Sequence, residues 1–253
     1  NDEIGELAES LSDMTQALWQ RMDAIESFAA DVAHEIKNPL TSLRSAVETT
    51  ARLKDPEQQR KLMTIIQEDV VRLDRLISDI SDASRLDAEL SRAETEPVDI
   101  GAMLETLVDL HNTTETNQGP IYLNRIGGED IPLIVDGIEI RLAQVFRNLF
   151  TNAISFSGPE DAITITTAND DGWISVEVDD EGPGLPAGEE DAIFERFYTQ
   201  RRESEKFGIH SGLGLSISRQ IINSHGGQLT AANRTDEDGG ILGARFTVLL
   251  PID

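Results

Sequence analysis

A heptad repeat in the first 35 residues constrains the fold of this chain more than any other feature. Apolar residues recur every seven positions along two seams, and only Arg21 and Glu35 interrupt them. This spacing predicts a long helix that pairs with another helix, because a helix lying on a globular core shows a wider apolar stripe. The seam residues are Ile4, Leu11, Leu18, Ile25 and Val32 on one line, and Leu7, Met14 and Phe28 on the other.

The repeat changes phase next to a histidine. After Val32 the spacing becomes four, four, three and four, which is a stutter that locally unwinds a coiled coil. His34 lies off the seam in either phase at ~100° per residue, so we expect its side chain to face solvent. Pro39 removes a helical hydrogen bond to the carbonyl oxygen of Glu35 and is expected to bend the helix just past His34. The apolar residues of the second phase are Ile36, Leu40, Leu43 and Val47.

His34 by itself does not indicate chemistry, since most surface histidines carry none. The pair His34-Glu35 begins the zinc motif H-E-x-x-H, but Asn38 stands where the second imidazole is needed, so that motif is absent. A role for His34 as a phosphate acceptor therefore depends on a nucleotide site elsewhere in the chain.

A second long helix is expected after Asp55-Pro56, which reads as an N-cap followed by proline at the first helical position. Its apolar stripe continues to about Leu86. Two long helices joined by a short turn form a hairpin, and one hairpin cannot bury both stripes, so we predict a homodimeric four-helix bundle. The stripe consists of Leu62, Ile66, Leu73, Leu76, Ile80 and Ala83.

Charge and composition exclude several functions. The chain has 253 residues, a formal charge of −26 and no cysteine. Such acidity argues against nucleic acid and anionic membrane surfaces as partners, and the lack of cysteine excludes disulfides and thiolate metal sites. No apolar run approaches the ~20 residues of a membrane span. Because residue 1 is not methionine and falls within a helical pattern, we expect a fragment of a longer protein.

The remainder predicts an α+β sandwich, in which one sheet of antiparallel type is faced by helices. Residues 91–97 are polar, end in Pro97 and are interpreted as a linker. The expected helices lie at about 99–111, 138–154, 189–195 and 213–225, and the strands near 120–125, 132–135, 162–168, 173–179, 227–233 and 241–250.

Two asparagines, Asn148 and Asn152, lie one turn apart on the expected helix within 141–157. Amide oxygens suit Mg²⁺ where a triphosphate already supplies the negative charge. The same spacing also fits a plain polar surface.

Asp180 follows a predicted strand and leads into Gly182-Pro183-Gly184. A carboxylate at a strand end can accept a hydrogen bond from the exocyclic amine of adenine and would reject the carbonyl oxygen of guanine. The glycines permit close approach of a ligand. An ordinary Gly/Pro turn explains the sequence equally well.

Residues 211–217 open a helix with Gly212 and Gly214. N–H groups at a helix N-terminus bind phosphate, and glycine lets the phosphate come close. The spacing matches neither a P-loop nor a Rossmann fingerprint.

Residues 198–211 lack periodicity and hold several of the chain's 21 basic residues. We interpret this segment as a lid over a nucleotide rather than a disordered loop, because its cations would offset the repulsion between an acidic protein and ATP. The cations are Arg201, Arg202 and Lys206, with Arg196 just before them.

In this order the motifs resemble those of bacterial sensor histidine kinases of two-component systems, and the resemblance covers nearly the whole chain. Residues 28–50 and the lid further resemble one envelope-sensing branch of that family. The matching motifs are an H box at 33–40, an N box at 148–152, a first glycine box at 180–184, an F box at 194–198, and a second glycine box at Gly212-Leu213-Gly214-Leu215.

The resemblance implies a role for each matched residue. His34 would accept the phosphoryl group, Glu35 would act as base, and Asn38 would position water for dephosphorylating the regulator. Asn152 with Asn148 would hold Mg²⁺, and Asp180 would select adenine. ATP would also contact Gly182, Gly184, Arg196, Tyr198, Gly212, Leu213, Gly214 and Leu215.

Two positions depart from the family pattern. Ser155 stands where a phosphate-binding lysine is common, and His210 replaces the first glycine of the second glycine box. We hypothesise that Arg147 or the lid arginines compensate for the missing cation. If nothing does, weaker nucleotide affinity is expected.

The implied fold is a dimeric helical bundle followed by an ATP-binding α/β sandwich of the GHKL type. We expect residues 1–20 to end a HAMP module or coiled coil, 21–92 to form the dimerisation and phosphotransfer domain, and 93–253 the catalytic domain. The implied function is ATP-dependent autophosphorylation of His34 and transfer to a response regulator, in the cytoplasmic portion of an inner-membrane protein. The alternatives are a regulator phosphatase or scaffold with a degenerate nucleotide site, and a GHKL ATPase of the repair or chaperone kind, which leaves His34 unexplained.

Overall fold

The computed structural model describes residues 2–53, 55–90, 92–114, 119–128, 132–198 and 211–252, with backbone alone at 2–10, 13, 17, 20, 21, 24 and 87. Its contacts divide the chain into a helical unit that ends at Ile80 and a mixed unit that begins at Ser81. Among the described helices, none is long and apolar enough to cross a membrane.

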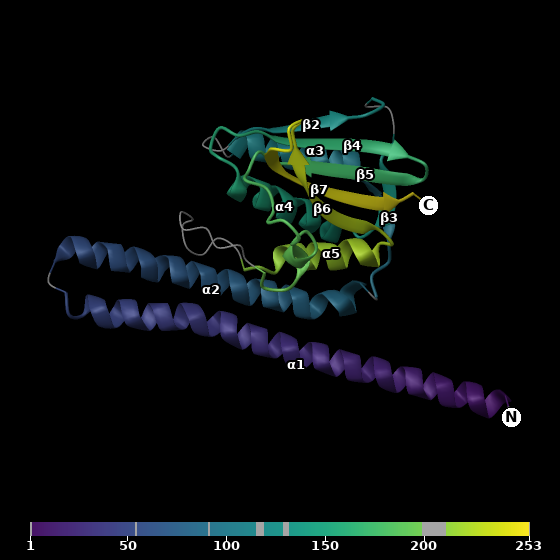
Figure 1. Ribbon diagram of the computed structural model, residues 1–253, viewed down its shortest axis with the longest axis horizontal. Coiled ribbons are helices and arrows are strands. Elements are labelled where there is room, and N and C mark those ends of the chain that lie inside the picture. The colour runs from purple at the N-terminus through teal and green to yellow at the C-terminus, as the bar shows by residue number, and fades with distance from the viewer. Residues whose placement is uncertain are drawn as a thin grey trace. The chain divides into compact units, whose positions relative to one another are not determined.

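The helical unit is a hairpin of two long helices (Figure 1). Helix α1 spans Asp2–Thr50 and continues through Pro39, and helix α2 spans Pro56–Leu90. The N–H of Glu57 donates to Oδ1 of Asp55 over 3.0 Å, which confirms the predicted cap and helix start.

One seam of this hairpin is buried and another is open. Ala46 and Leu76 are buried, as is Pro39. Leu40 and Val47, from the second phase of the repeat, remain 50% and 53% exposed, as do seam residues farther upstream. An apolar seam left open in one chain is what a dimeric bundle requires, and the homodimer stays a prediction. The upstream residues are Leu11, Met14, Leu18 and Ile25.

The mixed unit contains a five-stranded sheet with the order β2-β4-β5-β7-β6, and helices α3, α4 and α5 lie on one face of it (Figure 1). Strand β2 pairs with β4 in parallel and the other pairs are antiparallel. The elements are α3 Ile100–Thr114, β2 Ile121–Arg125, α4 Glu139–Phe156, β4 Ile163–Asp170, β5 Trp173–Asp179, α5 Gly214–Ser224, β6 Gln228–Thr235 and β7 Ile241–Pro251.

The core lies between the sheet and the helices. Alternate residues of β4 and β5 are buried, as a sheet with one covered face requires. They meet the apolar stripe of α4, which fixes the rotation of that helix and turns its asparagines away from the core. The residues on the two sides are Ile163, Ile165, Ile174, Val176 and Val178 from the sheet, and Leu142, Val145, Phe146 and Leu149 from α4.

Two predictions about the strands were wrong. The expected linker runs into strand β1, Glu96–Asp99, which pairs antiparallel with β3, Ile134–Gly137, as a separate two-stranded sheet. Pro97 resembles a strand breaker, but a two-stranded sheet has only edge strands, where proline is tolerated. The single antiparallel-type sheet is also wrong, because β2 is parallel to its neighbour and β1 and β3 form a second sheet.

The helix predicted at 189–195 is only a 3-10 turn, η1, Ala192–Phe194. Gly188 adopts a left-handed φ of +82° just before the predicted range. Glu195 is extended and ends the turn. The other predicted helices and strands are confirmed, with ends shifted by a few residues.

Candidate functional site

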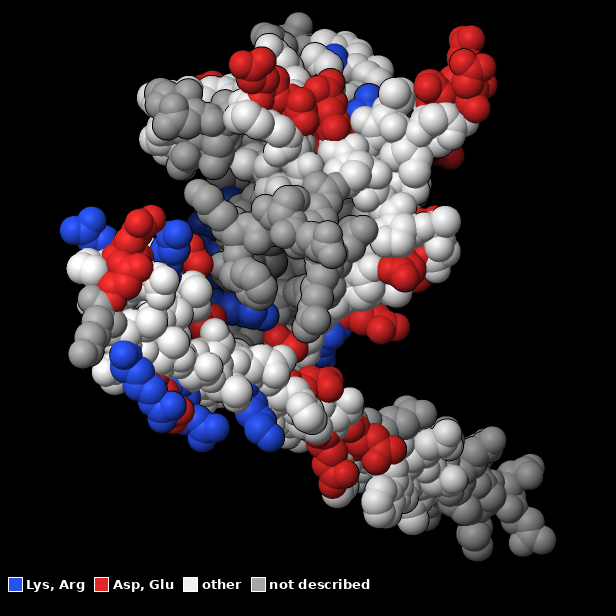
Figure 2. Space-filling view, turned by 60° about the vertical axis from the view of Figure 1, so that its left-hand side comes forward, with Lys and Arg blue, Asp and Glu red and all other residues white. Residues whose placement is uncertain are grey.

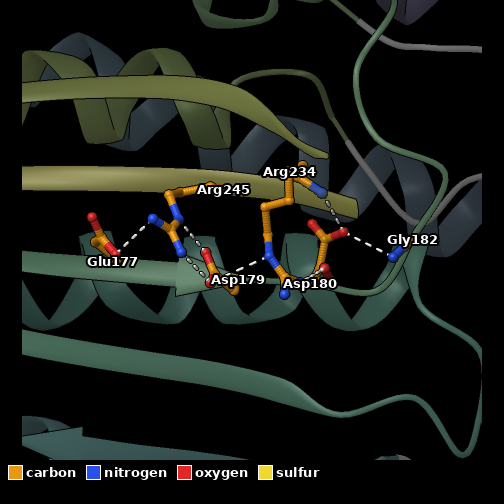
Figure 3. Close-up of polar contacts among 7 residues, drawn as sticks. Glu177, Asp179, Asp180, Gly182, Arg234 and Arg245 are labelled. Carbon is orange, nitrogen blue, oxygen red and sulfur yellow. Dashed lines mark hydrogen bonds and ion pairs between the residues drawn. The ribbon is translucent and has the colours of Figure 1, made fainter. Parts of the chain in front are cut away.

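Asp180 follows the last residue of β5 and is 2% exposed (Figure 3). One carboxylate oxygen, Oδ1, accepts hydrogen bonds from the N–H groups of Gly182 and Ala244, both over 2.9 Å. No described residue donates to the other oxygen, Oδ2. Asp180 therefore keeps one acceptor for a ligand while its other oxygen is held by the backbone.

Burial raises the pKa of Asp180 above the usual value for aspartate. The hydrogen bonds from Ala244 and Gly182 and the nearby cation Arg234 lower the pKa, and the charge of Asp179 raises it. The carboxylate is thus partly desolvated in advance, and a hydrogen bond to it from a ligand is stronger than one made in water.

The backbone around Asp180 is tightly packed because two glycines leave space. Gly184 adopts a φ of +76°, which L side chains rarely adopt. A Cβ at Gly243 would collide with the carbonyl oxygen of Asp180. The turn geometry therefore requires a glycine at position 184 of the first glycine box and at position 243 of β7.

Asn148 of α4 joins the N box to the second glycine box. Its Nδ2 donates to the carbonyl oxygen of Gly214 over 3.1 Å and contacts Oγ of Ser218 at 3.2 Å. Ser218 is fully buried, and its hydroxyl donates to the same carbonyl oxygen over 2.8 Å. The amide nitrogen of Asn148 thus faces α5, and its Oδ1 is left for a ligand.

Asn152 and Ser155 follow on the same helix. The hydroxyl of Ser155 donates to the carbonyl oxygen of Asn152 over 2.7 Å, so this position bonds to its own helix. Arg147 is exposed, and no hydrogen bond or ion pair joins it to another described residue. The structure thus does not bring Arg147 to the other site residues.

The F box is anchored by ring packing. Phe194 is buried and meets Phe246 edge-to-face, with centroids 6.4 Å apart. The guanidinium of Arg219, from α5, lies 4.9 Å from the Phe194 ring centre and pairs with Asp191 at 3.1 Å.

A backbone bond ties the F box to the second glycine box. The N–H of Phe197 donates to the carbonyl oxygen of Gly212 over 2.9 Å, and both residues have positive φ. The hydroxyl of Tyr198 hydrogen-bonds to Glu189, and burial together with this acceptor raises the pKa of Tyr198 to about 12. Arg196 is exposed. The lid cations Arg201, Arg202 and Lys206, and also His210, lie outside the described residues.

The phosphoacceptor candidates lie on α1. His34 and Asn38 are exposed, as the heptad phases predicted for His34. Glu35 forms an ion pair with Arg72 of α2 at 3.4 Å, and each side chain is 24% exposed. The register of the hairpin places Arg72 there, which the sequence analysis missed. Sequence patterns likewise gave no sign of Arg234, which contacts Asp180 from β6.

The metal-binding candidates of the site are the side-chain amide oxygens of Asn148 and Asn152. Within the described ranges no group of three or more His, Cys, Asp or Glu side chains is arranged to hold a metal ion.

Two family models match the chain. Residues 24–89 match the His Kinase A (phospho-acceptor) domain, and residues 137–253 match the histidine kinase-, DNA gyrase B-, and HSP90-like ATPase. The chain is 52% identical to Sensor protein ChvG of Agrobacterium fabrum and 51% identical to Sensor protein ChvG of Rhizobium meliloti, over 99% of this chain. The matches span 43% and 44% of those proteins, so the chain covers less than half the length of these relatives.

Solved structures show the same architecture. Histidine kinase ThkA in complex with response regulator protein TrrA matches with a TM-score of 0.69 and 28% identity, over 92% of this chain and 64% of that chain. Acinetobacter baumannii histidine kinase AdeS matches with a TM-score of 0.61 and 21% identity, over 87% of this chain and 98% of that chain, which bears on the fold alone.

Proposed function

The chain belongs to the sensor histidine kinases and is of the ChvG type, and from this membership we propose that it transfers the γ-phosphoryl group of ATP to His34 and then to an aspartate of a response regulator. The observation that carries the ATP half is Asp180. Its buried carboxylate has one oxygen held by two N–H groups and the other left for an amine. That arrangement accepts from adenine and opposes guanine.

In the transfer step a ring nitrogen of His34 attacks the γ-phosphorus of ATP. The new N–P bond forms as the bond to the β,γ-bridging oxygen breaks, and ADP leaves. Glu35 accepts the imidazole proton. The ion pair of Glu35 with Arg72, which comes from the other helix of the hairpin, supports this role because it fixes the carboxylate next to the histidine.

The catalytic residues contribute mainly by positioning the phosphates and by electrostatics. We propose that ATP also contacts Tyr198, Arg196 and the two glycine boxes. Gly212 and Gly214 lie at the start of α5, where N–H groups face an incoming anion. Asn38, which is exposed beside His34, would position water for dephosphorylating the regulator.

Mg²⁺ fits the donor atoms of α4. Asn148 has its amide nitrogen bonded to α5, so its Oδ1 remains as a ligand, and Asn152 offers a second amide oxygen one turn later. Neutral oxygen ligands suit a cation whose charge is balanced by phosphate, and the ion would neutralise the charge of the transferring group.

Charge on the hairpin supports a regulator partner. Figure 2 shows Lys and Arg side chains gathered over the hairpin near its interhelical turn, in a chain whose net charge is −26. Arg44, Arg52, Arg60 and Lys61 are exposed there. The aspartate to be phosphorylated belongs to the partner, and cations steer an acidic surface toward this end of the hairpin.

The remaining assignments extend the family relationship to the parent protein. The functional protein is a homodimer, because each hairpin leaves an apolar seam open. Residues 1–20 end a HAMP module or coiled coil, 21–92 form the phosphotransfer domain and 93–253 the catalytic domain. This chain is then the cytoplasmic portion of an inner-membrane protein, with sensor and membrane segments upstream.

Incubation of the protein with γ-labelled ATP tests the proposal. We expect label that is labile in acid and stable in alkali, as phosphohistidine is, and none in a His34→Gln variant. Transfer to an isolated receiver domain should then chase the label from the wild-type protein. Label that persists in His34→Gln would refute the acceptor assignment.

A second candidate is a regulator phosphatase or scaffold with a weak nucleotide site. Ser155 favours it, because its hydroxyl is bonded to its own helix and supplies no cation to a phosphate. Absence of label from wild-type protein that still removes phosphate from a phosphorylated receiver would support this candidate over the kinase.

A further inference from the structure

We propose that Arg234 is a positioning residue of the adenine site, holding the backbone of Asp180 so that its free oxygen meets the 6-amino group of the purine. This inference rests on the proposed ATP site and adds a specificity determinant to it. Arg234 belongs to β6 and lies in none of the sequence motifs of the site.

Arg234 bonds directly to the main chain of Asp180 (Figure 3). Its Nη1 donates to the carbonyl oxygen of Asp180 over 2.7 Å. The N–H of Asp180 donates to the carbonyl oxygen of Ala244 over 3.0 Å. Both peptide groups of this residue are therefore fixed, one by strand β7 and the other by a side chain from β6.

Arg234 is itself held in place by a second carboxylate. Its Nε lies 3.3 Å from Oδ2 of Asp179, which is only 7% exposed. Arg245 donates two hydrogen bonds of 2.7 Å to the same carboxylate and also forms an ion pair with Glu177 at 3.0 Å. Buried carboxylates are stable only when paired, so these guanidiniums form one connected group with fixed geometry (Figure 3).

This group lies on the sheet face opposite the helices. Val178 points into the core, so Asp179 and Glu177 point to the other face, where they meet Arg245 and Arg234. Asp180 comes immediately after, where the strand ends and the chain turns toward the ligand. Asp179, which the two guanidiniums hold, is thus joined to the proposed adenine-binding residue Asp180 by a single peptide bond.

The direction of the free oxygen depends on this peptide. Oδ1 of Asp180 is held by the N–H groups of Gly182 and Ala244, so Oδ2 can move only if the backbone of Asp180 moves. Loss of the hydrogen bond from Arg234 frees the carbonyl group of Asp180 and lets the Asp180 carboxylate turn. Sites that select by one hydrogen bond tolerate displacements of only about 0.5 Å.

Comparing the binding of two nucleotides distinguishes a role of Arg234 in positioning Asp180 from a role in stabilising the fold alone. We compare Mg-ATP with the Mg complex of purine riboside triphosphate, which carries hydrogen in place of the 6-amino group. Arg234→Met is expected to weaken ATP binding about tenfold, the size of one charge-assisted hydrogen bond, and to leave the analogue almost unchanged. The preference of the wild-type protein for ATP over the analogue should fall by the same factor.

Two further variants sharpen the test. Arg234→Lys keeps the positive charge but lacks the fork that joins Asp179 to the carbonyl of Asp180, so its preference for ATP should also fall. Arg125→Met removes another guanidinium from the same unit, one that pairs with Glu105 at 2.9 Å, and should leave the preference unchanged.

Equal losses for both nucleotides, or an unchanged preference in Arg234→Met, would overturn the inference. If Arg234→Met does not fold, an unchanged preference in Arg234→Lys would overturn it instead. Wild-type protein that binds neither nucleotide would overturn the ATP site itself, whereas ATP binding with an unaltered preference in the variants overturns the role of Arg234 alone.

Discussion

Replacing Asp180 by asparagine separates the stability of the fold from recognition of adenine. The two side chains have the same shape, and Oδ1 of asparagine can still accept from Gly182 and Ala244, each over 2.9 Å in the wild-type protein. Nδ2 then stands where Oδ2 stood. A donor faces the amino group of adenine, while the carbonyl oxygen of guanine becomes the matching partner.

The expected loss of ATP affinity follows from the bond that is removed. A hydrogen bond to a charged group contributes about 1.5–3 kcal/mol, so its loss alone should weaken ATP binding by roughly 10- to 150-fold, and the two opposed donors weaken it further. The preference for ATP over GTP should fall more than ATP binding itself, because binding of GTP gains a partner.

Stability should change in the opposite direction. Burial raises the pKa of Asp180, which means that the fold disfavours its charged form. A neutral asparagine relieves this cost near neutral pH. We therefore expect the melting temperature of Asp180→Asn to equal or exceed that of the wild-type protein.

Calorimetric titration with Mg-ADP and Mg-GDP, together with thermal unfolding of the same samples, measures all three quantities. Asp109→Asn is a matched control that removes one exposed carboxylate from α3. Unchanged ADP affinity in Asp180→Asn, or a lower melting temperature with an unchanged preference for adenine, would show that Asp180 is structural and refute the reasoning.

Three further predictions concern neighbouring groups. Because the pKa of Asp180 is raised, ATP affinity should fall on acidification at a higher pH than for an ordinary aspartate, as titrations from pH 7 downward would show. Over the same pH range the difference in stability between the wild-type protein and Asp180→Asn should shrink, as thermal melts would show. Asn148→Ala should lower the free energy of unfolding by about 1–3 kcal/mol in urea, because it removes the hydrogen bonds to α5. Asn152→Ala should mainly weaken Mg²⁺-dependent ADP binding, measured by titration with and without Mg²⁺. His225→Phe should cost about 1–3 kcal/mol in urea unfolding, because Nε2 of His225 accepts the N–H at the start of α4 over 3.0 Å, and a variant as stable as wild type would contradict this.

Local patterns predicted the elements that depend on local physics. The alternation of β4 and β5 and the apolar stripe of α4 reflect one covered face, so their positions followed from the sequence. The parallel pairing of β2 and the strand at Pro97 depend on partners far along the chain, and no local pattern carries that information.

The same distinction holds within the candidate site. Asp180 and the two asparagines lie in short motifs whose spacing has a chemical meaning, so they were predicted. Arg234 lies 54 residues after Asp180, and only the order β5-β7-β6 brings them together. A basic residue on a strand has no local feature that marks it as part of a nucleotide site.

In the proposed complex, Asp180 and Asn148 each bond to the protein scaffold with one end of the side chain and to the ligand with the other. Oδ1 of Asp180 and Nδ2 of Asn148 are bonded to the protein. Oδ2 of Asp180 and Oδ1 of Asn148 are the atoms that we propose for adenine and for a cation. A side chain with one end bonded to the scaffold cannot rotate freely, so the direction of its other end is fixed before a ligand arrives and little ordering free energy is lost on binding. Ser155 takes no part in this division, because its hydroxyl is bonded to the carbonyl oxygen of Asn152 within its own helix.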